Sequence, residues 1–113
     1  MVLNRAPLRR TRMRRVGKKG RERAKRLDGL RPLIEARARG RCENPSCRAR
    51  PGQNGPLDIE HAVARSQGGT DSLENCWLAC RYGCHEAKHR HELLVTPNGD
   101  GTFSFKRVAI PTH

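Results

Sequence analysis

Aromatic residues are scarce in this chain, and it has no long apolar run. Only 4% of the 113 residues are aromatic and 35% are hydrophobic. A chain of this size and composition cannot bury a large core, and small cores commonly depend on a bound metal or on disulfides. The sequence also lacks an apolar segment after its basic start and any run of membrane-spanning length. We therefore expect one small cytoplasmic domain with extensions, without a signal peptide or a membrane anchor.

Acidic residues are few in the first third of the chain, where basic residues accumulate. Residues 1–41 hold 16 of the 24 Lys and Arg but three of the 11 acids, and residues 42–113 hold eight of each. The net charge of +13 thus belongs to the N-terminal third. Such a segment attracts phosphates through counterion release, which predicts nucleic acid as a partner. A solubilising arm is an alternative, and the lack of a bulky amphipathic face disfavours lipid binding.

The basic residues most suited to DNA phosphates lie in the arm and around the histidines described below. They are Arg9, Arg10, Arg12, Arg14, Arg15, Lys18, Lys19, Arg65 and Lys88. For Arg65 and Lys88, solvated surface charge is the alternative role.

Composition divides the chain into four segments. Residues 1–20 have no apolar periodicity and are expected to be a disordered basic arm. A helical basic extension over 21–41, a core over 42–92 and a hairpin with a tail over 93–113 follow. Within the extension, Asp28-Gly29 weakens the first helix and Pro32 is placed to start a second one, which Gly40 would end.

Short elements are expected within the core and the hairpin. Leu57–Val63 alternates apolar and polar residues, as a half-buried strand does. Residues 75–80 suit a second strand or a turn, and residues 81–93 suit a helix. Near the C-terminus, Asn98-Gly99-Asp100-Gly101 separates two strand-like runs and predicts a hairpin.

Two closely spaced cysteine pairs predict a structural zinc site. Cys42 and Cys47 are separated by four residues, and Cys80 and Cys84 by three. Each pair can supply one edge of a tetrahedron, and an odd cysteine count in a reducing compartment favours metal over disulfides. Incidental burial of the thiols is the alternative. Cys76 and Cys80 are likewise separated by three residues, and we interpret Cys76 as a buried or spare thiol.

The histidines follow the first cysteine pair in a recognisable order. Glu60-His61, Gly68-Gly69, Asp-Ser-Leu-Glu-Asn75, Cys84-His85 and Lys88-His89 succeed one another. This order resembles the HNH endonuclease family over about 42–91. The resemblance implies a small α+β fold, the ββα-metal (His-Me) finger, here stabilised by the four-cysteine zinc site. The basic start is also similar to small HNH proteins of bacteriophages, which implies a phage terminase as a partner and the host cytoplasm as the location.

The resemblance assigns a role to each matching residue. His61 would be the general base that activates water for attack on a phosphodiester. Glu60 and His85 would hold a divalent metal, Mg²⁺, Mn²⁺, Ni²⁺ or Zn²⁺, and His89 would be a further ligand. Asn75 would orient the loop and the His61 imidazole, or touch the metal.

The chemistry of phosphodiester hydrolysis asks for these residue types independently. It needs a cation to offset developing charge and a base that titrates near neutral pH and stays off the metal. We therefore predict a metal-dependent endonuclease that nicks or cuts DNA, as a monomer or dimer. A zinc-stabilised nucleic-acid-binding module without catalysis, or a basic structural protein, are the alternatives.

Overall fold

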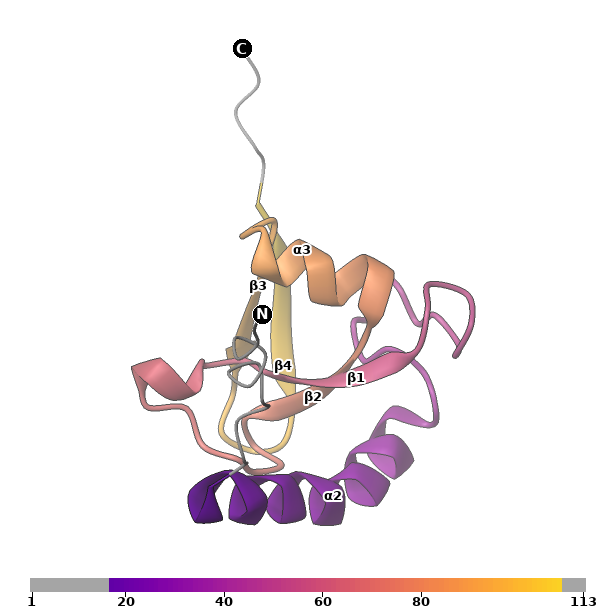
Figure 1. Ribbon diagram of the computed structural model, residues 1–113. Helices are drawn as coiled ribbons and strands as arrows, with labels where there is room; N and C mark the ends of the chain where they lie inside the picture. The colour runs from indigo at the N-terminus through magenta and orange to yellow at the C-terminus, as the bar shows by residue number, and fades with distance from the viewer. Residues whose placement is uncertain (1–16, 109–113) are drawn as a thin grey trace, which may run out of the picture.

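The computed structural model describes residues 17–108, which form a small α+β domain. A long helix, α2 (Lys18–Ala38), lies on one side of the antiparallel strands β1 (Leu57–His61) and β2 (Cys76–Cys80). The short helix α3 (Glu86–His89) lies on the other side (Figure 1). The arm through residue 16, with the DNA contacts expected at Arg9, Arg10, Arg12, Arg14 and Arg15, is outside the described residues.

Helix α2 differs from its prediction in two ways. It begins at Lys18, three residues before the expected boundary, and it continues through Pro32 instead of being divided there. Proline inside a helix costs about 3 kcal/mol. Tertiary contacts of the second half offset that cost, because Ile34 and Ala38 are buried in the core. The helix ends as expected before Gly40, with Arg39 in the left-handed conformation.

Arg37 connects the C-terminal half of α2 to neighbouring segments through hydrogen bonds. Its guanidinium donates to both Glu43 carboxylate oxygens at 2.7 and 2.8 Å, and to the carbonyls of Leu73 and Cys76 at 2.6 Å each. Glu43 in turn accepts from the amide of Leu78 at 2.9 Å. One ion pair thus joins the helix, the first cysteine segment and β2.

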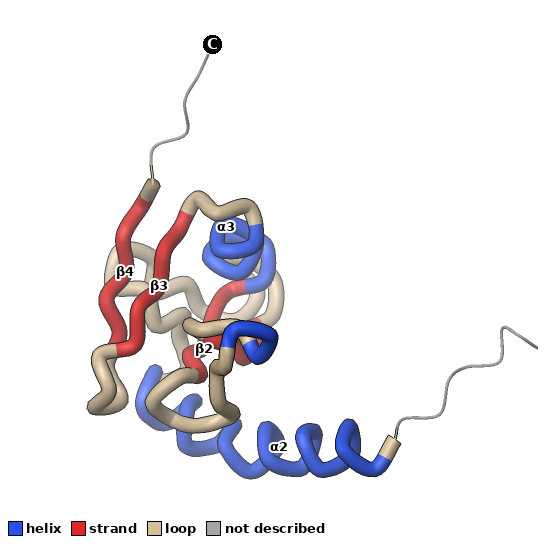
Figure 2. Tube along the Cα trace, turned by 90° about the vertical axis from the view of Figure 1, so that its left-hand side faces the viewer, coloured by secondary structure: helices blue, strands red, loops and turns tan. Residues whose placement is uncertain are grey.

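Strands β1 and β2 pair in a register from Leu57 opposite Cys80 to His61 opposite Cys76. All five β2 residues are buried, since α2 covers one face and other elements the second. The hairpin of β3 (Leu93–Pro97) and β4 (Phe103–Arg107) forms where the sequence predicts it. It packs beside β2 (Figure 2), and the Phe105 ring meets the buried Trp77 ring edge-on at 5.1 Å.

Between β2 and α3 the chain forms one wide helical turn, η2 (Arg81–His85), with π-type hydrogen bonding. Such a turn accommodates one extra residue within a helix. This is how the chain absorbs the three-residue gap between Cys80 and Cys84 and continues into α3. Among residues 17–108, no helix is long and apolar enough to span a bilayer.

Candidate metal centre

Four thiols from two distant segments meet beside α3. Cys42 and Cys47 come from the loop after α2, Cys80 ends β2, and Cys84 lies within η2. Their sulfurs lie within 4.8 Å of one another, so this cluster could hold a metal ion. The sulfurs of Cys47 and Cys80 are 3.7 Å apart. A set of four cysteine sulfurs is suited to tetrahedral zinc.

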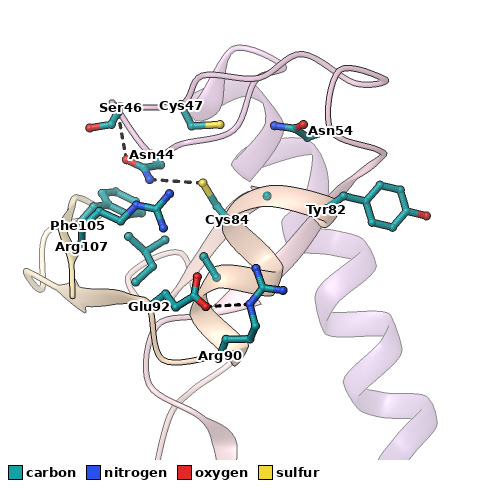
Figure 3. A pocket seen from close by; sticks show the side chains of 13 residues that line it. Asn44, Ser46, Cys47, Asn54, Tyr82, Cys84, Arg90, Glu92, Phe105 and Arg107 are labelled. Atoms are coloured by element: carbon teal, nitrogen blue, oxygen red, sulfur yellow. Dashed lines mark hydrogen bonds and ion pairs between the residues drawn. The ribbon is translucent and has the colours of Figure 1, made fainter. Parts of the chain in front are cut away.

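Amide groups surround the sulfurs, as the outer partners of metal thiolates do. The backbone amide of Cys84 donates to the Cys80 sulfur at 3.2 Å. The side-chain amide of Asn44 donates to the Cys84 sulfur at 3.4 Å (Figure 3), and that of Asn54 to the Cys80 sulfur at 3.9 Å. These donors favour thiolates over thiols.

The thiols also influence each other's ionisation. A hydrogen bond from Cys84 lowers the pKa of Cys42, whereas that bond and burial raise the pKa of Cys84. Burial raises the pKa of Cys47 as well. Metal binding would therefore release protons from the thiols whose pKa is raised. Cys76 stands apart, fully buried in β2, with its sulfur 3.9 Å from the Thr70 carbonyl.

A second cluster, which shares no residue with the first, also lies beside α3. Glu60 at the end of β1, His85 at the end of η2 and His89 at the end of α3 offer ligand atoms within 4.8 Å of one another. One Glu60 oxygen contacts Nδ1 of His85, and the other lies 3.3 Å from Nε2 of His89. The Glu60 side chain is only 10% exposed. A buried carboxylate between two imidazoles is a plausible site for a divalent cation.

His61 lies beside this cluster but turns towards a different partner. Its Nε2 is 2.7 Å from Oδ1 of Asp71, whose side chain is 6% exposed. Burial raises the pKa of Asp71, but hydrogen bonds from His61, Arg65 and Arg26 outweigh it and lower that pKa to about 2. Asp71 is therefore ionised and accepts a hydrogen bond from the protonated Nε2, which leaves the lone pair of His61 on Nδ1.

Glu60 and His61 are consecutive in a strand, yet both line one cleft of about 480 Å³. We call it the metal-site cleft; Arg65, His85, Lys88 and His89 also line it. Consecutive strand residues ordinarily face opposite sides. Here the strand ends at His61 and the chain turns immediately into the loop with η1 (Arg65–Gln67), so the cleft opens around the strand end.

Asn75 holds that loop. Its buried amide accepts from the amide of Val63 at 2.8 Å and donates to the carbonyls of Val63 and Thr70 at 3.0 and 2.9 Å. The loop-orienting contact expected of Asn75 is thus present. In residues 17–108 its side chain makes no hydrogen bond to His61, and the imidazole is held by Asp71 instead.

Sequence reasoning did not give Asp71 a role, although it stands in the quoted Asp-Ser-Leu-Glu-Asn segment. A signal was available: Asp71 is an acid two residues after Gly69, in the loop that must fold back towards His61. Of the expected phosphate contacts, Lys18 and Lys19 are exposed on the first turn of α2. Arg65 and Lys88 reach the metal-site cleft.

Comparison with known families identifies the segment that carries both clusters. Residues 42–91 match the family model described as HNH endonuclease. The match covers 50 of the 113 residues and includes every residue of both clusters. The match supports a nuclease or nucleic-acid-binding role for this segment, and the four-cysteine cluster is compatible with a zinc-knuckle form of the HNH domain. Neither the search of curated proteins nor that of solved structures found a match.

Proposed function

We propose that the protein is a metal-dependent endonuclease that hydrolyses DNA phosphodiester bonds. The observation that carries the proposal is that the candidate metal ligands and the candidate base are separate residues of the metal-site cleft. Glu60, His85 and His89 converge as a possible ligand set, while His61 lines the same cleft with its Nε2 engaged by Asp71. A ligand set next to a separately held base is what hydrolysis requires and what DNA binding alone does not.

Glu60, His85 and His89 would hold the divalent cation, which can be Mg²⁺, Mn²⁺, Ni²⁺ or Zn²⁺. Bound there, it would supply positive charge against the charge that develops on the phosphate and the leaving oxygen. Glu60 is the anionic member, and its burial between the two imidazoles keeps its oxygens directed at the shared position. Cys42, Cys47, Cys80 and Cys84 would hold a structural Zn²⁺, since their sulfurs lie within 4.8 Å of one another and amide donors at Cys80 and Cys84 favour thiolates.

His61 would take the proton from the attacking water. Nδ1 is the atom for this step, because Nε2–H is donated to Asp71. As Nδ1 gains the proton, the nearby Asp71 carboxylate stabilises the imidazolium electrostatically. Asp71 thus fixes both the ring orientation and the tautomer of the base. Asn75 contributes indirectly by fixing the loop that carries Asp71.

A supercoiled plasmid assay with Mg²⁺, Mn²⁺ or Ni²⁺ tests the proposal. We expect nicked or linear product from the wild type and a loss of at least 100-fold in His61→Ala, since general base catalysis contributes roughly 10²–10⁴-fold. Retained zinc content and duplex binding would show that the variant is folded. Undiminished cleavage by folded His61→Ala would exclude His61 as the base.

A non-catalytic nucleic-acid-binding module is the second candidate, favoured by the excess charge of the N-terminal third. Duplex retention without cleavage under any of these metals would support it. For the biological setting, we propose action beside a phage terminase, on the sequence resemblance alone. Co-purification with the terminase encoded nearest to its gene tests that setting.

A further inference from the structure

A second cleft adjoins the metal-site cleft on the side of α2. We call it the arginine cleft; its volume is about 450 Å³, and its lining residues are Arg23, Arg26, Arg65, Gly69, Thr70 and Asp71. Arg23 and Arg26 are three residues apart, so they project from the same face of α2. Arg65 comes from the loop that follows β1 and lines both clefts.

The arginine cleft carries excess positive charge. Three guanidiniums face one carboxylate, that of Asp71, which accepts from Arg26 at 3.2 Å and from Arg65 at 3.0 Å. Each of these arginines uses one nitrogen in that contact, whereas a guanidinium carries five N–H donors. Their side chains are 54% and 39% exposed, so the remaining donors are accessible from solvent.

These features suit a phosphate group, which guanidiniums bind through two oxygens at once. The exposed Thr70 also lines this cleft, with its hydroxyl paired to that of Ser72 at 2.8 Å. The position matters as well: Asp71 lies in the arginine cleft yet bonds His61 of the metal-site cleft. A phosphate bound here would lie next to the proposed centre of hydrolysis. It would therefore be a neighbour, along the same DNA backbone, of the phosphate at that centre.

We propose that the arginine cleft binds a backbone phosphate that flanks the one to be hydrolysed. The cleft thus sets the position of duplex DNA relative to His61. This inference rests on the proposed DNA substrate. It assigns Arg23, Arg26 and Arg65 to positioning of the backbone, and it gives the described part of α2 a defined contact with DNA, separate from the arm before it.

Salt-dependent binding of a 20-base-pair duplex, measured by fluorescence anisotropy with full-length protein and no added divalent metal, tests the subsite. We expect Arg26→Gln/Arg65→Gln to weaken binding about tenfold. The slope of log affinity against log salt should fall by about 0.9, the loss of one phosphate contact. Arg50→Gln/Arg107→Gln is the matched control: it removes the same charge at two exposed arginines outside the cleft.

Zinc content and melting temperature show whether the double variant is folded. If the double variant is not folded, Arg23→Gln tests the subsite in its place. Arg23 lies in the cleft without pairing to Asp71, so its replacement should also weaken binding. An unchanged slope in the deciding variant, or an equal fall in the control, overturns the subsite. Because no cleavage occurs in this assay, the subsite and the nuclease proposal can fail independently.

Discussion

The imidazole of His61 and the carboxylate of Asp71 meet at 2.7 Å between Nε2 and Oδ1, although they are separated by the loop around Gly68 and Gly69. The loop is folded back by Asn75, which bonds the backbone at Val63 and Thr70. The same carboxylate accepts from Arg26 of α2. The proposed base is therefore connected by one buried acid to the basic helix.

Replacing Asp71 with Asn should reduce kcat by at least tenfold while leaving KM within about threefold. Asparagine keeps the shape but not the charge, so it no longer fixes the tautomer or stabilises the imidazolium. Single-turnover cleavage with saturating protein measures the effect. Asp71→Glu keeps the charge and should recover part of the rate; equal losses in both variants would indicate a merely structural role.

Asp71 should also contribute stability that depends on pH. Its pKa is about 2 in the folded protein, against about 3.9 for an unfolded aspartate. A lowered pKa stabilises the fold above the unfolded value, and the contribution is lost as pH falls from about 4 to 2. The difference in melting temperature between wild type and Asp71→Asn should therefore shrink between pH 5 and 2.5. A constant difference would contradict this linkage.

Gly83→Ala should weaken metal retention by the cysteine cluster. A methyl group on Gly83 would lie 2.8 Å from the Cys80 sulfur and 3.1 Å from Nδ2 of Asn54. Displacing a thiolate or its amide partner typically lowers metal affinity about 10- to 100-fold. Competition with a chromogenic chelator measures the change.

Gly29→Ala is the matched control for that variant. Gly29 is inside α2, and a methyl group there meets no atom within 4 Å. Alanine should stabilise the helix by up to about 1 kcal/mol without altering metal retention. Equal chelator sensitivity in the two variants would show that crowding at Cys80 is not the cause.

Arg37→Ala should destabilise the domain by about 3 kcal/mol, because it leaves the mostly buried Glu43 carboxylate without its cationic partner and removes a donor from two carbonyls. Urea denaturation measures the loss. Arg90→Ala removes an exposed arginine paired with Glu86 and Glu92, and should change stability by less than about 1 kcal/mol. Similar losses of stability in both variants would mean that the Arg37 hydrogen bonds stabilise the domain no more than an exposed ion pair does.

Local patterns predicted much of this fold. The alternation from Leu57 and the Asn98–Gly101 turn locate strands, because side-chain direction and turn chemistry are properties of neighbouring residues. Helix α2 was predicted less well. Local propensity divides it at Pro32, whereas burial of Ile34 and Ala38 against distant segments keeps it continuous.

The site shows the same distinction between local pattern and three-dimensional contact. By itself the sequence determined which residue types are available: two cysteine pairs, Glu60, three histidines and a basic first third. Only the tertiary structure decided their partners. The wide turn η2 accommodates the extra residue before Cys84 and still directs His85 to Glu60. The folded loop places Asp71, and not Asn75, in hydrogen-bonding contact with His61. Spacing along a chain limits local geometry, but contacts between residues ten or more positions apart depend on how the loops between them fold.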